Sequence, residues 1–190
     1  MSWEAFAVST GVVALGEMGD KTQLLALLLA ARFRKPLPII AGILVATLAN
    51  HAGASALGSW LTQVINPTWM RYGLGASFIA VALWMLVPDK ADDSDATSAS
   101  RWGVFGVTVV AFFLAEMGDK TQIATVMLAA RYQSLVVVTA GTTLGMMLAN
   151  VPAVLLGDKA VKFVPIQWVH RIAAIVFAVL GVAMLLGLGS

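Results

Sequence analysis

The chain has 190 residues, of which 59% are apolar and 12% charged, and its formal net charge at neutral pH is +2. Soluble domains carry about 25% charged residues, so this composition excludes most soluble folds and disordered chains. Twelve Lys and Arg residues are spread over the whole chain, which argues against a nucleic-acid-binding surface. The absence of cysteine excludes disulfides, zinc–thiolate sites and thiol nucleophiles. The composition predicts a small all-α integral membrane protein.

Six apolar runs are long enough to be transmembrane helices, since a span needs about 20 predominantly apolar residues. They cover residues 5–31, 37–61, 69–87, 104–130, 135–157 and 172–189. The first run is not expected to be a cleavable signal peptide, because no Lys or Arg precedes it and it is longer than the apolar core of such a peptide. We therefore predict six transmembrane helices.

Lys and Arg residues are distributed unequally between the two sides of the predicted membrane. The loops after the first, third and fifth runs hold eight of them, whereas the opposite side holds only Arg71 and Arg131. Cytoplasmic loops are enriched in Lys and Arg, so both termini are expected outside the cytoplasm. The acidic segment 89–101 would then be a cytoplasmic linker, and a solvated tether is favoured over a loop that collects metal ions.

The two halves of the chain repeat one another at an offset of 99 residues. Residues 17–23 and 116–122 both read EMGDKTQ, and further matches follow downstream. We therefore predict a first three-helix repeat at 1–88 and a second at 102–190. Because three is odd, the second repeat would enter the membrane from the opposite side. Such inverted repeats are typical of secondary transporters, whose sites lie near the midplane where the repeats meet.

Each repeat places the same three charged side chains near the middle of its first span: Glu17, Asp20 and Lys21, and again Glu116, Asp119 and Lys120. An ionised group at this depth costs on the order of 3 kcal/mol, so we expect these groups to face one another or water. On a regular helix Glu17, Asp20 and Gln23 would form one polar stripe. Lys21 follows Glu17 by four residues, the spacing of a helical ion pair. The second copy repeats this arrangement.

The charge of this cluster indicates what it would bind. Four carboxylates and two ammonium groups sum to −2, which one divalent cation or two protons would neutralise. Clustered carboxylates in a low dielectric cannot all ionise cheaply, so the same site could hold either. The candidate ligands all offer oxygen: Glu17, Asp20, Gln23, Asn50, Glu116, Asp119, Gln122 and Asn150. Oxygen ligands suit Mn²⁺, Ca²⁺ or Mg²⁺. The residues thus predict a divalent-cation/proton antiporter with no resident cofactor.

Structural roles are the alternative for several of these residues. Glu–Lys pairs can hold helices together, with Gly19 and Gly118 allowing close packing. Thr22 and Thr121 are expected to bond a backbone carbonyl one turn back, and to become ligands only if the helix breaks at the glycine. His51 has no counterpart in the second repeat and is interpreted as a packed neutral histidine rather than a ligand.

The doubled motif Glu-x-Gly-Asp-(Lys/Arg)-(Thr/Ser), at residues 17–22 and 116–121, resembles that of a family of small membrane cation exchangers. The family includes bacterial manganese exporters and eukaryotic Golgi manganese/calcium transporters. The resemblance implies export of Mn²⁺, with Ca²⁺ as a second candidate, across the bacterial inner membrane in exchange for protons. It also implies that Glu17, Asp20, Glu116 and Asp119 build the cation site.

Other function classes fit the residues less well. An intramembrane enzyme could use paired carboxylates as acid and base, but His-Glu-x-x-His and serine-nucleophile motifs are missing. Catalysis would also not explain a motif that occurs twice. A passive channel or an organic-solute exporter remains open, and a channel would differ by lacking proton coupling. The expected partners are the metal ion, protons and the lipid bilayer, with no nucleic acid.

Overall fold

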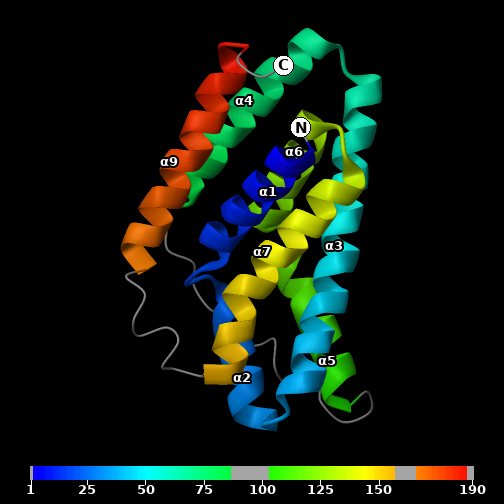
Figure 1. The fold of residues 1–190 in the computed structure, drawn as a ribbon, viewed down its shortest axis with the longest axis vertical. Coiled ribbons are helices and arrows are strands. Elements are labelled where there is room, and N and C mark those ends of the chain that lie inside the picture. The colour runs from blue at the N-terminus through cyan, green and yellow to red at the C-terminus, as the bar shows by residue number, and fades with distance from the viewer. Residues whose placement is uncertain (1, 87–102, 157–165, 188–190) are drawn as a thin grey trace.

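The computed structural model describes residues 2–86, 103–156 and 166–187. Within these ranges it is all-helical, as predicted, with eight helices and no strand (Figure 1). The helices are α1 (Ser2–Glu17), α2 (Lys21–Phe33), α3 (Pro36–Val64), α4 (Pro67–Trp84), α5 (Gly103–Glu116), α6 (Lys120–Tyr132), α7 (Leu135–Leu156) and α9 (Ile166–Leu185). The predicted acidic linker 89–101 lies outside the described residues.

The first and fourth apolar runs are each divided into two helices. α1 ends at Glu17 and α2 begins at Lys21, while α5 ends at Glu116 and α6 begins at Lys120. Gly19 and Gly118 lie in these breaks with φ of 81° and 75°, a left-handed backbone that glycine adopts without steric cost. The expectation of a continuous helical stripe is therefore wrong, because the chain changes direction within each motif.

Long unbroken helices accompany these divided ones. Three of the described helices, α3, α7 and α9, are long and apolar enough to cross a membrane. Pro36 and Pro67 occupy the first turns of α3 and α4, where a missing N–H costs nothing. α9 begins at Ile166, six residues before the apolar run that predicted it, so the segment around Trp168 is also helical.

Each divided helix packs against the long helix of the other half of the chain. α1 and α2 lie along α7, whereas α5 and α6 lie along α3, and α3 also packs on α7. Glycines permit close approaches: a Cβ on Gly42 of α3 would lie 2.7 Å from Thr108 Cβ of α5, and one on Gly141 of α7 would lie 2.8 Å from the Phe6 carbonyl oxygen of α1. The two breaks are thereby brought together inside the bundle.

α4 and α9 form a separate pair at one end of the molecule. They pack on each other, with Phe78 and Phe177 ring centroids 6.1 Å apart, and against α1 and α6. In Figure 1 this pair lies beside α1 and α6, and α2 and α5 occupy the opposite end. The packing of α4 and α9 on the rest of the molecule is therefore one-sided.

Candidate metal centre

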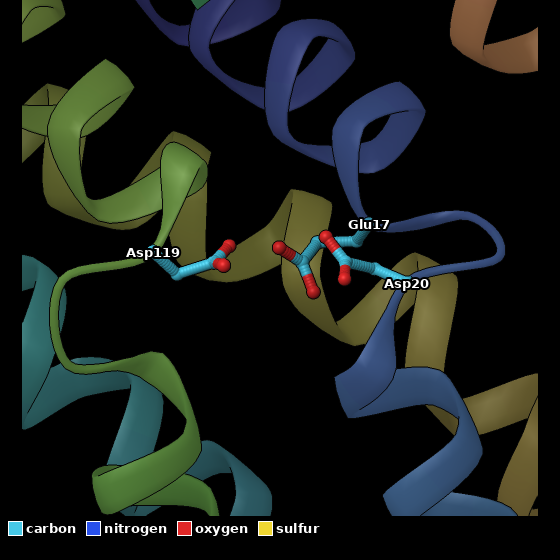
Figure 2. A group of neighbouring side chains, drawn as sticks. All are labelled: Glu17, Asp20 and Asp119. Carbon is cyan, nitrogen blue, oxygen red and sulfur yellow. The ribbon is translucent and has the colours of Figure 1, made fainter. Parts of the chain in front are cut away.

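The two helix breaks face one another and bring acidic side chains together. Figure 2 shows Glu17 and Asp20, at the first break, pointing toward Asp119 at the second. One carboxylate oxygen from each of these three residues lies within 4.8 Å of the other two. Glu17 and Asp20 are fully buried and Asp119 is 3% exposed. Three carboxylates at such spacing have the chemistry to hold one cation, since oxygen ligands suit hard divalent ions.

Asp20 and Asp119 owe their positions to the ends of the second helices. Asp20 is the N-cap of α2 and accepts a hydrogen bond from the backbone N–H of Lys21 at 2.6 Å. Asp119 caps α6 in the same way, through the N–H of Thr121 at 3.4 Å. An N-terminal helix end favours negative charge. The helix ends therefore fix the positions of two carboxylates of the cluster.

The two lysines pair across the breaks rather than within their own motif. Lys21 Nζ lies 3.0 Å from Asp119 Oδ1, and Lys120 Nζ lies 3.4 Å from Asp20 Oδ2. The suggested helical pair of Lys21 with Glu17 is wrong, because Glu17 ends α1 and Lys21 begins α2. Lys120 is fully buried, whereas Lys21 is 31% exposed. Each lysine therefore links the motif of one half to that of the other.

The threonines hold the glutamates. Thr22 Oγ1 donates to Glu17 Oε2, and Thr121 Oγ1 lies 3.3 Å from both Glu116 Oε2 and Asp119 Oδ2. Neither hydroxyl bonds the backbone carbonyl one turn back that a continuous helix would offer, so that expectation is wrong. Glu116 is thus connected to Asp119 through Thr121 and lies beside the group of three.

The two glutamines close the breaks. Gln23 Oε1 accepts from the N–H of Gly19 at 2.9 Å, and Gln122 Oε1 accepts from the N–H of Gly118 at 2.8 Å. The Gln23 amide donates to the Ala149 carbonyl oxygen of α7, and that of Gln122 to Asn50 Oδ1 of α3. These side chains therefore tie each break to the long helix of the other half.

The asparagines differ from each other in the oxygen that they offer. Asn50 Oδ1 already accepts from Gln122, while its amide donates to the Phe113 carbonyl oxygen at 3.1 Å. Asn150 donates to the Met146 carbonyl oxygen at 3.1 Å, and its Oδ1 has no hydrogen-bond partner among the described residues. Of the two, Asn150 keeps the oxygen that is more available to a cation.

Several buried acceptors at the site lack a donor. Glu17 Oε1 and Glu116 Oε1 have no hydrogen-bond partner within the described part of the chain, and both side chains are fully buried. Burying a carboxylate oxygen without a partner is costly. A cation, or a proton on the carboxyl group, would satisfy these atoms, so the donor set fits the chemistry inferred from its charge.

His51 lies beside the carboxylates, although the repeat pattern of the sequence did not indicate this position. Its side chain is fully buried on α3, and Nε2 lies 4.0 Å from Glu116 Oε2. The other histidine, His170 of α9, lies with Nε2 2.8 Å from the carbonyl oxygen of Met18 in the first break. The adjacency of His51 to Asn50 was the only signal in the sequence that could have pointed to it.

Known proteins resemble this chain in sequence over nearly its whole length. A family model described as "Divalent cation/proton antiporter GDT1" matches residues 5–93 and 104–189. A Vibrio cholerae protein named "Putative manganese exporter" is 49% identical over 178 residues, which cover 93% of this chain and 88% of that protein. "GDT1-like protein sll0615" of Synechocystis is 28% identical over 196 residues, covering 91% of this chain and 92% of that protein. No solved structure matches the chain.

The family is one of transporters and not of enzymes. Its model matches the chain once in each half, and each matched segment contains one of the two helix breaks with its Glu, Asp and Lys residues. The chain therefore belongs to the GDT1 family of divalent cation/proton antiporters.

Proposed function

We propose that this protein exports Mn²⁺ from the cytoplasm in exchange for protons, with Ca²⁺ as a second substrate. The observation that carries the proposal is the buried carboxylate group of Glu17, Asp20 and Asp119 between two helix breaks. The manganese assignment is supported by the name of the Vibrio cholerae relative, and proton coupling by the family description.

The ligands in this proposal are the four motif carboxylates, with amide oxygens in support. Glu17, Asp20, Glu116 and Asp119 would contact the ion. Asn150 offers a fifth oxygen that lacks a hydrogen-bond partner among the described residues. Gln23, Gln122 and Asn50 would act through the breaks, since their oxygens already accept hydrogen bonds. Lys21 and Lys120 tune the charge of the site.

Exchange follows from the charge of the site. Each lysine pairs with an aspartate, so the two glutamates account for the net charge of −2. One divalent cation would neutralise this charge, and so would two protons. An empty site, with a charge of −2, and a site holding both the ion and two protons, with a charge of +2, are both costly in a low dielectric. Metal and protons would therefore replace one another rather than bind together.

The proposal includes six membrane spans arranged as two inverted repeats, 1–88 and 102–190. It is supported by the two separate matches of the family model and by the reciprocal packing of α1 on α7 and α5 on α3. In the orientation expected from Lys and Arg, both termini lie outside the cytoplasm and the α2 and α5 end faces it. The membrane in question is the bacterial inner membrane.

Alternating access would use the α4–α9 pair. An inverted repeat exchanges α1 with α5, α2 with α6 and α4 with α9. The packing of α9 on α1 would then have its counterpart in α4 on α5, and the packing of α4 on α6 would have its counterpart in α9 on α2. These two counterpart interfaces are not among the substantial helix contacts of the described residues. We interpret this asymmetry as one end state of the transport cycle, in which α4 and α9 close the outer side of the site.

The proposal is tested by metal uptake into inside-out vesicles with and without an imposed pH gradient. We expect Mn²⁺ uptake that an acidic vesicle interior accelerates, and slower uptake of Ca²⁺. Replacement of Glu116 or Asp119 by Ala should abolish it. Uptake that is indifferent to the pH gradient would indicate a passive channel, and uptake that survives both substitutions would exclude this site as the pathway.

A further inference from the structure

His51 departs from the duplication at the site. The Asn50 of α3 is matched by Asn150 of α7, but the residue after it is His51 in the first half and Val151 in the second. His51 is fully buried and its Nε2 faces Glu116. The site therefore has an imidazole on one side only, next to the glutamate that the group of three carboxylates leaves out.

Both ring nitrogens of His51 lack a hydrogen-bond partner among the residues that the structure describes. A buried histidine that only fills space normally satisfies at least one nitrogen, because an unsatisfied buried polar group costs about 1–3 kcal/mol. The 4.0 Å between Nε2 and Glu116 Oε2 is too long for a hydrogen bond. The contact therefore satisfies neither ring nitrogen, whereas Glu116 Oε2 accepts from Thr121 Oγ1 at 3.3 Å.

The same separation suits two ligands of one ion. Divalent ions lie about 2.0–2.6 Å from their ligands, so two ligands of one ion lie roughly 3–5 Å apart. Glu116 Oε1 also has no hydrogen-bond partner in the described segments. An ion placed between His51 and Glu116 would satisfy atoms on both side chains at once.

We propose that His51 Nε2 and Glu116 form a binding position for a divalent transition-metal ion, beside the Glu17, Asp20 and Asp119 carboxylates. This inference rests on the proposed function and adds a nitrogen ligand to it. Ca²⁺ and Mg²⁺ take oxygen ligands almost exclusively, whereas imidazole binds first-row transition metals. His51 would therefore separate Mn²⁺ from Ca²⁺ and Mg²⁺.

The same chemistry limits the selectivity. For one set of nitrogen and oxygen ligands, affinity rises from Mn²⁺ through Fe²⁺ to Co²⁺. A site with His51 as a ligand should therefore bind Fe²⁺ and Co²⁺ at least as tightly as Mn²⁺. A site built of oxygen ligands alone would show a weaker rise along this series and a smaller preference for Mn²⁺ over Ca²⁺.

Pulsed electron paramagnetic resonance of Mn²⁺ bound to the purified full-length protein tests the ligand directly. We expect a nitrogen hyperfine coupling that changes when the histidines carry ¹⁵N. Because the chain has two histidines, His170→Gln is the matched control: the coupling should persist in it and vanish in His51→Gln. Bound Mn²⁺ without histidine nitrogen coupling in the wild-type protein would overturn the inference, even if His51→Gln does not fold.

Selectivity gives a second readout. The ratio of Ca²⁺ to Mn²⁺ dissociation constants should fall roughly tenfold or more in His51→Gln, with Mn²⁺ still bound through the carboxylates. An unchanged ratio would identify His51 as a packing residue. Failure of the wild-type protein to bind Mn²⁺ at all would contradict the proposed function itself, so the two failures are distinguishable.

Discussion

Lys21 Nζ lies 3.0 Å from Asp119 Oδ1, so the lysine of the first motif is the partner of the aspartate of the second. The reverse pair, Lys120 with Asp20, completes the exchange at 3.4 Å. These pairs fasten the two helix breaks to one another and neutralise both aspartates. They leave Glu17 and Glu116, each held by a threonine hydroxyl, as the motif carboxylates with which neither lysine forms an ion pair among the described residues.

The two lysines should differ in their contribution to stability. Lys120→Met leaves Asp20 as a buried charge without its ammonium partner, and breaking a buried pair costs about 3–5 kcal/mol. Lys21→Met should cost less, because Lys21 is 31% exposed and its pair with Asp119 is therefore less deeply buried. Thermal unfolding in detergent measures the difference, and equal losses for the two variants would contradict it.

A double variant separates charge from side-chain packing. Replacing both partners, Lys120→Met with Asp20→Asn, removes the unpaired charge, so the double variant should recover part of the stability lost in Lys120→Met alone. It should not recover transport, since Asp20 is also part of the carboxylate group. A double variant no more stable than Lys120→Met would show that the ion pair is not the source of the effect.

The backbone of the break should be essential for transport. Gly118→Ala forces an L-residue into φ of 75°, at a cost of about 1–2 kcal/mol, and the strain displaces the neighbouring Asp119. Gly103 is the matched control, because its φ is 66° and, as at Gly118, an added Cβ would meet nothing within 4 Å. Vesicle uptake of Mn²⁺ should fall strongly in Gly118→Ala and little in Gly103→Ala.

Equal effects of these two substitutions would mean that strain alone, and not the geometry of the break, limits transport. Protein level in the membrane and thermal unfolding should be measured for both variants. The variants should lose similar stability, since both carry the same kind of strain, and this similarity makes the expected difference in uptake informative.

The α4–α9 pair should move relative to α1 during transport. His170 of α9 contacts Met18 in the first break, and the chain has no native cysteine. Cysteines at 18 and 170 joined by a short bifunctional thiol reagent should therefore stop Mn²⁺ uptake. Cysteines at Gly75 of α4 and Leu185 of α9, which are also in contact, join two helices that would move together.

Cross-linking the pair at 75 and 185 should leave most of the uptake intact. If a cross-link between residues 18 and 170 also leaves uptake intact, α9 does not need to separate from α1. The proposed motion of the α4–α9 pair during transport would then be wrong. If both cross-links stop uptake, α4 and α9 do not move as one unit.

The sequence predicted which charged residues lie together better than how they are arranged. The doubled motif pointed to the carboxylates and lysines because intramembrane charges are costly and here occur twice. The sequence did not decide whether the helices break at Gly19 and Gly118, because a glycine within a helix costs only about 1 kcal/mol and EMGDKTQ also fits a continuous helix. Consequently the pairing of Lys21 and the hydroxyl bonds of Thr22 were assigned to the wrong partners.

Features that depend on how the two halves approach were beyond sequence reasoning. The pairing of Lys21 with Asp119 joins residues from different halves, and no spacing along one helix encodes it. The position of His51 next to Glu116 depends on α3 packing against α5 and α6. Because His51 occurs only once, the repeat that revealed the other residues gave no signal for it.

Proton release on metal binding is the most direct test of whether metal and protons share the Glu17 and Glu116 carboxylates. Mn²⁺ would be titrated into lightly buffered purified protein while the protons released per bound ion are counted, with Glu17→Gln/Glu116→Gln as the comparison. We expect the wild-type protein to release protons as it binds Mn²⁺, and the double variant to release few. Stoichiometric Mn²⁺ binding by the wild-type protein with no proton release at any pH would contradict exchange at this site.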